Sequence, residues 1–599
     1  MKQLYKYFKP YLFVLVILIG FTYGQSIINL TLPDLTADII NKGIIGNNNS
    51  LVYKTGLEML LITLIGGAIT VVIGYLGARV ATGFSRRLRA AVFAKIESFS
   101  LAEFDTFSSA SLITRSTNDI QQIQSVLLVL LRVALLAPIM GIGAVIKAYA
   151  LAPSMTWIML AAVLAIVALI TVLFIFAVPK FKLLQKLVDK LNLVSRESLT
   201  GLRVIRAFNR EKYEEKKFDQ TNKDLTGVNL AVNRLMVILQ PTIMLVMSFA
   251  SIAVVWVGAY RIGSGELLVG DMLAFMQYAI LAITSFLMIS IIFILVPRAA
   301  VSVSRVAEVL STESVILDPE NPKSLFGLKN GVVIDFNNVS FKYPEADGYA
   351  VNNVSFRAEP GQTTAIIGST GSGKTTLINL IPRFYDVAKG SIKINGVNIK
   401  DISQHDLMKH IGFVPQKATL FSGTVKSNIL YGRAKASDED VQHAAIVAQA
   451  DSFVSKMDLG YDSSVAQGGG NLSGGQKQRL GIARALAKKP QIYIFDQSFS
   501  ALDLKTDSQL RKALKPETKG KTVIIVAQRV STIIDADKIL VIDDGRIVGR
   551  GTHADLLEDS KEYREIAISQ LSKEEILGGI DNAGRAKRIG MLLENGVSS

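Results

Sequence analysis

The chain has 599 residues, a formal net charge of +15, a mean hydropathy of +0.36 and no cysteine. Half of the residues are hydrophobic and only 19% are charged, which excludes a disordered chain and is unusual for a soluble enzyme. The lack of cysteine excludes disulfides, thiolate metal sites and cysteine nucleophiles.

The first half of the sequence contains six long apolar runs, of which five carry no charged residue and one is interrupted only by Arg132. The runs are Tyr11–Leu32, Met59–Ala78, Val126–Ile146, Met155–Pro179, Leu235–Tyr260 and Met272–Pro297. Each reaches about 20 residues or more, which as a helix crosses the roughly 30 Å apolar core of a bilayer. We therefore expect a six-helix transmembrane domain with cytoplasmic helical extensions over residues 1–310.

Lysine and arginine are concentrated in alternate connections between these runs. Twelve of them lie between Lys180 and Lys223, whereas the opposite connections carry only Lys42, Lys54, Lys147 and Arg261. Because positive charge favours the cytoplasmic side, the sequence predicts a multi-pass protein of the plasma membrane with both termini in the cytoplasm. The same charge favours contact with lipid headgroups of the bilayer, and no nucleic-acid partner is expected.

From Gly331 onward, short β-branched runs alternate with helical stretches and turns, which is typical of an α/β domain. The predicted strands are Val332–Phe336, Thr363–Ile367, Ile392–Ile394, Ile411–Val414, Ile492–Phe495, Thr522–Val526 and Lys538–Ile542. We predict a multidomain membrane protein in which the helices are followed by a linker at 311–330, a cytoplasmic α/β nucleotide-binding domain at 331–575 and a tail at 576–599.

A glycine-rich segment follows the predicted strand Thr363–Ile367 and precedes an apolar helix. Its residues are Gly368, Ser369, Thr370, Gly371, Ser372, Gly373, Lys374, Thr375 and Thr376. This spacing is that of a phosphate-binding loop, in which backbone N–H groups surround phosphates, the lysine contacts the outer phosphates and the hydroxyl binds Mg²⁺. Asp496, at the end of another predicted strand, is expected to be the magnesium-linked carboxylate.

The segment Leu472-Ser473-Gly474-Gly475-Gln476 resembles the signature motif of ABC transporters. Tyr343, Gln416 and Asp503 match three further motifs of that family, which stack on adenine, contact Mg²⁺ and cross between paired domains. The resemblance implies ATP and Mg²⁺ as cofactors, with Thr375, Gln416 and Asp496 around the metal. It also implies a half-transporter of the type IV exporter layout, whose signature motif completes the ATP site of a partner subunit.

Two positions depart from the family pattern of hydrolysing members. Gln497 stands where a glutamate would follow Asp496, and Gln528 stands where a histidine would precede Arg529. An amide cannot accept a proton from the attacking water, and loss of a general base costs on the order of 10²–10⁴ in rate. Gln528 can still donate a hydrogen bond to the γ-phosphate.

These departures favour a natural degenerate subunit of a heterodimeric multidrug exporter, with an intact signature motif for the partner. A homodimer carrying an engineered Glu→Gln substitution is an alternative that explains Gln497 but leaves Gln528 unexplained. A degenerate chain whose residue 497 has also been altered is a third.

The substrate is weakly specified by the sequence. Gln240, Gln277 and Tyr278 are polar residues within the spans that could line a cavity, and a small lipophilic drug is what the family resemblance implies. A lipid or peptide exporter and an ATP-gated channel remain alternatives. By resemblance, coupling segments between membrane and nucleotide domains are expected near Phe107–Asp119 and Phe208–Tyr213.

Overall fold

The computed structural model describes residues 2–325, 331–344, 346–577 and 588–589. They form two compact units. The helical unit comprises Met1–Ser98 and Ser108–Thr312, and the α/β unit comprises Phe99–Phe107 together with the chain from Glu313 onward. The predicted linker 311–330 is described up to residue 325, and most of the predicted tail 576–599 lies outside the described residues.

The helical unit consists of long helices joined by short turns. Its α-helices are α1 (Lys2–Phe8), α2 (Leu12–Asp38), α3 (Asn49–Glu97), α5 (Ser109–Thr114), α6 (Ile120–Val129), α7 (Leu135–Leu151), α8 (Thr156–Thr200), α9 (Leu202–Ala207), α10 (Glu211–Gly263) and α11 (Val269–Ser311). Within the described residues, six continuous helical stretches are long and apolar enough to cross a membrane, and each contains one of the six predicted runs. The prediction of six membrane-spanning helices is confirmed.

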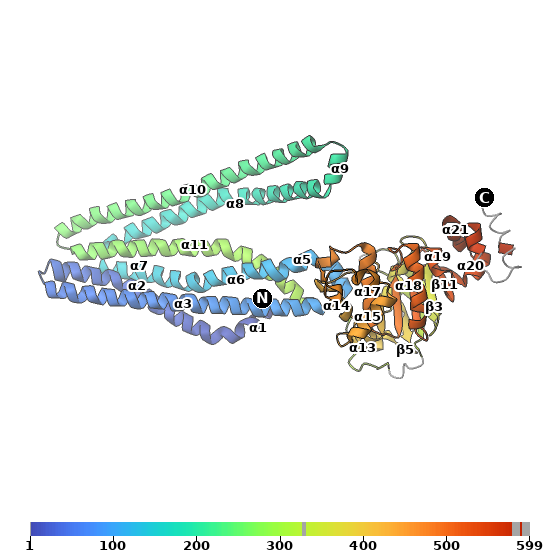
Figure 1. The fold of residues 1–599 in the computed structure, drawn as a ribbon. Coiled ribbons are helices and arrows are strands. Elements are labelled where there is room, and N and C mark those ends of the chain that lie inside the picture. Colours follow the sequence, from blue (N-terminus) through green and yellow to red (C-terminus); the bar gives the residue numbers. More distant parts are fainter. Residues whose placement is uncertain (1, 326–330, 345, 578–587, 590–599) are drawn as a thin grey trace. The chain divides into compact units, whose positions relative to one another are not determined.

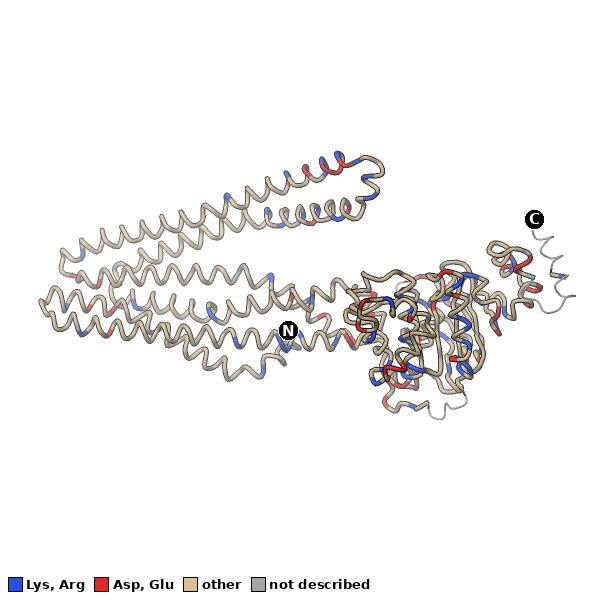
Figure 2. Tube along the Cα trace, in the orientation of Figure 1, with Lys and Arg blue, Asp and Glu red and all other residues tan. Residues whose placement is uncertain are grey.

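These stretches are 40 to 53 residues long. At 1.5 Å per residue they measure about 60–80 Å, at least twice the roughly 30 Å apolar core of a bilayer. The helices α8 and α10 run side by side, while α2, α3, α6, α7 and α11 lie together as a second group (Figure 1). Lys and Arg are frequent where α8 and α10 approach α9 and sparse along their middle (Figure 2).

A buried apolar cluster joins the two groups of helices. It includes Met159 on α8, Val254 on α10 and Phe275 on α11. Tyr278 belongs to the same cluster and is fully buried. The cluster therefore holds the α8–α10 pair against the rest of the unit.

The hydroxyl of Tyr278 donates to Asp34 Oδ1 at 2.6 Å and lies 2.8 Å from the carbonyl oxygen of Leu30. Lys147 on α7 forms an ion pair of 2.7 Å with the other oxygen of Asp34. Three helices thus meet at one carboxylate. Tyr278, predicted as a possible cavity-lining residue, ties α11 to α2 through its hydroxyl.

The α/β unit contains three sheets and short helices. Its strands are β1 (Ile334–Phe341), β2 (Val351–Ala358), β3 (Thr363–Ile367), β4 (Lys389–Ile394), β5 (Val397–Asn398), β6 (Ile411–Val414), β7 (Gly423–Thr424), β8 (Ser464–Val465), β9 (Ile492–Asp496), β10 (Thr522–Val526), β11 (Lys538–Asp543) and β12 (Arg546–Gly551). Its α-helices are α4 (Leu101–Phe107), α12 (Lys374–Asn379), α13 (Gln404–Lys409), α14 (Val425–Leu430), α15 (Asp438–Val447), α16 (Asp451–Val454), α17 (Gly474–Ala487), α18 (Leu504–Glu517), α19 (Val530–Ile533), α20 (His553–Asp559), α21 (Lys561–Gln570) and α22 (Lys573–Leu577).

The central sheet has the order β12-β11-β3-β10-β9-β6 and is parallel except for the edge strand β12. Its strands β9 and β10 are buried at every residue, as expected for a sheet covered on both faces. On one face, Phe495 and Ile525 pack with residues from α14, α15, α17 and α18. On the other, Ile494 and Ile524 pack with α12 and with the antiparallel sheet β2-β1-β4-β5.

The short helix α4 belongs to the α/β unit although it lies between α3 and α5 in the sequence. Ala102 packs on the apolar cluster of the antiparallel sheet, and Tyr385 donates a 2.7 Å hydrogen bond to Asp105. Glu103 accepts from the backbone N–H of Val315 at 3.0 Å. The predicted coupling segment near Phe107–Asp119 overlaps this helix at Phe107, whose ring stacks on that of Phe99.

We expect Tyr278→Phe to lower the thermal unfolding midpoint, because it removes the hydroxyl that joins α11 to Asp34. Such hydrogen bonds between membrane helices contribute about 0.6 kcal/mol on average and up to about 1.7 kcal/mol, which corresponds to a shift of roughly 1–4 °C. Tyr75→Phe is the matched control, since Tyr75 on α3 is 63% exposed. Equal thermal unfolding midpoints for the two variants in the purified protein would contradict a stabilising bond between Tyr278 and Asp34.

Candidate nucleotide-binding site

The glycine-rich segment forms a loop between β3 and α12, as predicted. At Gly373 the backbone has φ of 95°, and a Cβ atom there would lie 2.3 Å from the carbonyl oxygen of Ala350. Only glycine fits both the conformation and the close approach. The loop is therefore held tightly enough for its N–H groups to line an anion site.

Lys374 is 5% exposed, and its ammonium group is surrounded by loop oxygens. It donates to the carbonyl oxygens of Gly368 at 3.0 Å and Ser369 at 2.5 Å, and to Ser372 Oγ at 3.2 Å. Burial lowers its pKa, and the charge of Asp496 opposes that shift. The loop thus fixes a cation where phosphate oxygens would bind.

The hydroxyl of Thr375 donates to Asp496 Oδ1 at 3.1 Å, so two sites predicted to bind Mg²⁺ are brought together. Asp496 is 3% exposed; burial raises its pKa, while Thr375 and Lys374 oppose the shift. No cluster of three or more His, Cys, Asp or Glu suited to a metal is found among the described residues. One hydroxyl and one carboxylate suit Mg²⁺, which usually takes one or two carboxylates and completes its shell with phosphates and water.

Gln416, after β6, donates from Nε2 to Gln497 Oε1 at 3.0 Å. Gln497 has φ of 47°, and its backbone N–H donates to the carbonyl oxygen of Val526 at 2.9 Å. The side chain is therefore held beside Asp496 at the carboxyl edge of the sheet. Its amide can orient a water molecule there, but it cannot take up a proton.

Gln528 follows β10 and has an exposed side chain. It lines a cavity of about 570 Å³ together with Gly368, Ser369 and Thr370 of the phosphate loop. This is where a donor to the terminal phosphate is needed. Gln528, predicted to donate a hydrogen bond to the γ-phosphate, thus lines the same cavity as the phosphate loop.

Tyr343, predicted to stack on adenine, is half-buried at the end of the antiparallel sheet. Its hydroxyl lies 3.1 Å from Thr376 Oγ1, and its ring meets those of Phe341 and Tyr385 edge-on at 4.9 and 5.4 Å. The hydrogen bond links the aromatic position directly to the helix that follows the phosphate loop. Tyr385, which also contacts α4, was not identified from the sequence, because nothing in its local pattern distinguishes it.

The signature segment begins α17. Ser473 caps the helix by accepting from the N–H of Gln476 at 3.3 Å, and Gln476 Oε1 accepts from the N–H of Ser473 at 2.8 Å. Leu472 is buried, whereas a Cβ atom on Gly474 would meet nothing within 4 Å. The N-terminus of a 14-residue helix is thus open to an approaching anion on the side of Gly474.

Asp503 caps α18 by accepting from the N–H of Thr506 at 2.9 Å. The bonds with Thr506 lower the pKa of this carboxyl group. A Cβ atom on Gly475 would lie 3.2 Å from the carbonyl oxygen of Ala501, so the signature helix and the segment before Asp503 are neighbours. Both predicted partner-facing segments therefore lie on one surface of the α/β unit.

The two remaining substrate candidates differ in environment. Gln240 on α10 is exposed and Gln277 on α11 is half-buried. Tyr278 is buried. The substrate role of all three residues stays a prediction.

Two family models match the chain. One, described as the ABC transporter transmembrane region, matches residues 15–286, and the other, described as ABC transporter, matches residues 351–500. An uncharacterized ABC transporter ATP-binding protein of Mycobacterium tuberculosis is 38% identical over 580 residues, which cover 96% of this chain and 99% of that protein.

Two further relatives carry names that state a transported class. The ATP-dependent lipid A-core flippase of Pseudomonas aeruginosa is 33% identical, covering 88% of this chain and 86% of the flippase. A probable multidrug resistance ABC transporter ATP-binding/permease protein of Bacillus subtilis is 39% identical, covering 62% of this chain and 63% of that protein.

A solved structure of a bacterial Atm1-family ABC exporter with ATP bound superposes with a TM-score of 0.77 at 26% identity, covering 93% of this chain and 98% of that chain. The family models, the full-length relatives and this fold agree with the geometry of the phosphate loop and the six spans. The chain therefore belongs to the ABC transporter family, as a multi-pass membrane protein that joins a transmembrane region and an ATP-binding domain in one polypeptide.

Proposed function

We propose that this chain is the catalytically weak half of a heterodimeric exporter that moves small lipophilic molecules out of the cell. The observation that carries the proposal is Gln497, an amide held against Gln416 at the strand end where a general base belongs. The open N-terminus of α17 complements it, because that surface remains able to serve a partner's ATP site.

The residues of this chain's own site divide into binding and reacting groups. Lys374 and the loop around it bind phosphates, and Thr375 with Asp496 supplies oxygen ligands for Mg²⁺. Bound Mg²⁺ would neutralise charge on the outer phosphates. Gln497 orients water without accepting its proton, so the site holds ATP for much longer than it would with a carboxylate there.

The signature segment acts on the ATP bound by the partner subunit. Ser473, Gly474 and Gly475 present the start of α17 to the terminal phosphate, where the helix N-terminus favours negative charge. Closure of the two ATP-binding domains around two nucleotides then requires one contribution from each chain. Hydrolysis at the partner's site reopens the pair.

Nucleotide-driven closure reaches the membrane region through short segments at the ends of long helices. The helix α4 is one, because Asp105 and Glu103 fix it to the α/β unit. The turn around α9 is the second, since it exposes Leu202 and Val204 at 44% and 60% and Phe208 at 74%. We assign this turn, with its exposed apolar side chains, to the partner's ATP-binding domain.

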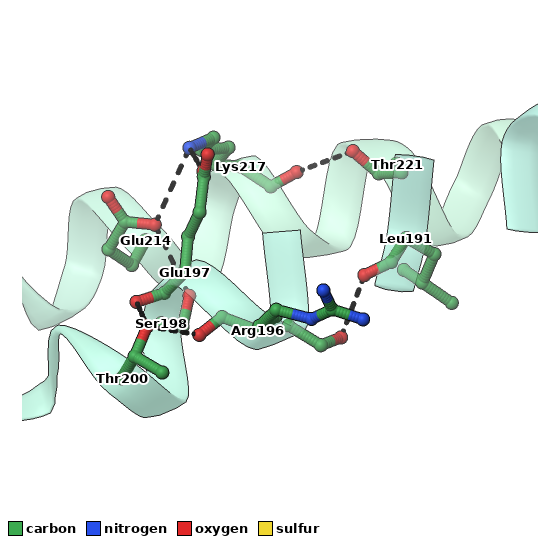
Figure 3. Close-up of polar contacts among 9 residues, drawn as sticks. Leu191, Arg196, Glu197, Ser198, Thr200, Glu214, Lys217 and Thr221 are labelled. Atoms are coloured by element: carbon green, nitrogen blue, oxygen red, sulfur yellow. Dashed lines mark hydrogen bonds and ion pairs between the residues drawn. The ribbon is translucent and has the colours of Figure 1, made fainter. Parts of the chain in front are cut away.

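Polar contacts stiffen the helices on either side of α9 (Figure 3). Lys217 on α10 pairs with Glu197 on α8 at 2.9 Å, and Ser198 donates to Glu214 at 3.3 Å. Exposed ion pairs of this kind contribute only about 0–1 kcal/mol each, but here they join both helices at the base of one turn. The hairpin can therefore move as a unit.

A lipid is the second candidate substrate, favoured by the relative named as a lipid A-core flippase. Gln277 and Gln240 would offer hydrogen bonds to a polar headgroup as readily as to a drug. Transport assays in proteoliposomes with a fluorescent lipid and a lipophilic dye separate the two. In either case the positive charge near α9 supports a plasma-membrane protein with cytoplasmic termini.

Gly474→Asp and Lys374→Ala should have unequal effects in the assembled heterodimer. The aspartate fits without a clash because Gly474 faces open space, and it repels the phosphate of the partner's ATP. We expect ATP hydrolysis to fall by about 10²-fold for Gly474→Asp, the size of effect that follows loss of one transition-state donor, and by less than about threefold for Lys374→Ala. Gly474→Asn is the uncharged control. Equal losses for Gly474→Asp and Lys374→Ala would instead favour a homodimer.

Gln497→Glu should raise hydrolysis at this chain's own site, because it restores a proton acceptor where Gln416 already provides a hydrogen bond. An increase of about 10²-fold lies within the usual range for a general base, and Gln528→His in the same chain should increase it further. Turnover is measured with the partner's site inactivated. The control is Gln442→Glu on an exposed position of α15, and no gain in the double variant would contradict the proposed cause of the weak activity.

A further inference from the structure

Gln570, the last residue of α21, makes two hydrogen bonds to the loop that carries Gln528. Its Nε2 donates to the carbonyl oxygen of Gln528 at 2.9 Å, and its Oε1 accepts from the N–H of Val530 at 2.8 Å. The polarity of the two backbone groups fixes the orientation of the amide. One side chain thus pairs with two residues of the loop as a neighbouring strand would.

From Gln528 onward the loop after β10 lies beyond the end of the sheet, so no neighbouring strand in the described part of the chain offers hydrogen-bond partners to its backbone. The backbone N–H of Ala527 still bonds to Ile366 at 3.0 Å, but Gln528 and Arg529 are exposed beyond the end of β10. Val530 begins α19, whose capping residue Arg529 makes no side-chain hydrogen bond to the helix. Gln570 satisfies the first N–H of that helix, which would otherwise depend on water.

The helix α21 is well anchored at its other end. Tyr563 is fully buried, and its hydroxyl bonds to His553 Nδ1 at 2.7 Å. Ser560 caps the helix by accepting from the N–H of Tyr563 at 3.2 Å, and Ala567 is fully buried one turn before the end. The buried Tyr563 and Ala567 therefore fix the backbone of α21 up to one turn before Gln570.

The same helix lines the cavity beside the phosphate loop. Ser569 and Gln570 line the cavity of about 570 Å³ that also contains Gly368, Thr370 and Gln528. Gln570 therefore acts on the loop at the point where it faces the phosphate loop. A change in the loop backbone there moves the side chain of Gln528 relative to the terminal phosphate.

We infer that Gln570 is a positioning residue for ATP recognition, which holds the Gln528 loop so that the Gln528 amide meets the γ-phosphate. The inference rests on the proposed role of Gln528 toward that phosphate. It assigns the helix α21 to the ATP site, and it predicts that a change at Gln570 affects ATP binding without affecting ADP binding.

The test compares affinities for MgATP and MgADP in the full-length assembled transporter, by displacement of a fluorescent nucleotide from this chain's site. Gln570→Leu keeps the bulk and removes both hydrogen bonds. We expect it to weaken MgATP binding about three- to tenfold, the effect of one lost hydrogen bond, and to leave MgADP binding unchanged within twofold. Gln570→Glu keeps the acceptor for the N–H of Val530 but loses the donor to the carbonyl oxygen of Gln528, so this variant is also expected to bind MgATP more weakly.

Gln442→Leu on α15 controls for the removal of an exposed glutamine from a helix of the same domain. Gln528→Ala should reproduce the ATP-specific loss, and the double variant should lose no more than Gln528→Ala alone. If Gln528→Ala changes nothing, the γ-phosphate contact is wrong. If Gln528→Ala acts and Gln570→Leu does not, or if Gln570→Leu weakens ATP and ADP equally, the positioning role is wrong.

Discussion

The register of the parallel strands is the constraint on which the nucleotide site depends. Val526 on β10 is paired with Ile366 on β3 and with Asp496 on β9, so the three strands end at one level. The loops that follow must leave the sheet side by side, and they carry the phosphate loop, Gln497 and Gln528. A shift of one strand by one residue would turn its buried side chains to the opposite face and separate these groups. The cores on both faces of the sheet therefore also fix the chemistry at its edge.

In the proposed function, the helical unit has to carry motion over a distance that exceeds the bilayer. The helices α8 and α10 have 45 and 53 residues and continue beyond any apolar run without interruption. A continuous helix of that length can transmit a displacement at one end to the other, and the Lys217–Glu197 ion pair and the Ser198–Glu214 hydrogen bond beside α9 join the two helices. The charges at this end keep it in water, while the apolar middle remains in lipid. The alternation of apolar and charged segments that predicts the membrane topology thus also gives α8 and α10 their length beyond the bilayer.

The sequence predicted the parallel strands well because burial leaves a strong local pattern. The predicted strands Thr363–Ile367, Ile411–Val414 and Thr522–Val526 match β3, β6 and β10 residue for residue. The strands β2 and β12 were missed, since their alternating exposed residues resemble turns and loops. Motif spacing predicted the residues of the phosphate loop and its neighbours, but not the contacts of Tyr278, Asp105 or Gln570. Their hydrogen bonds join residues more than 40 positions apart in the sequence, so no local sequence pattern can reveal them.

The contacts around Gln497 bear on why an amide is tolerated where a base is expected. The bond from Gln416 Nε2 needs only an oxygen acceptor, which a glutamine and a glutamate both offer. The backbone at residue 497 is fixed by its N–H bond to Val526, which does not depend on the side chain. Exchange between the two side chains therefore changes proton affinity and charge while the geometry of the site is retained. Natural divergence and a deliberate substitution would leave the same structure at residue 497. A deliberate substitution at 497 would not explain Gln528, because a homodimer that hydrolyses ATP at both sites has no reason to replace the histidine there. The pair of glutamines, rather than either one alone, favours a site adapted to hold nucleotide while the partner's site turns over.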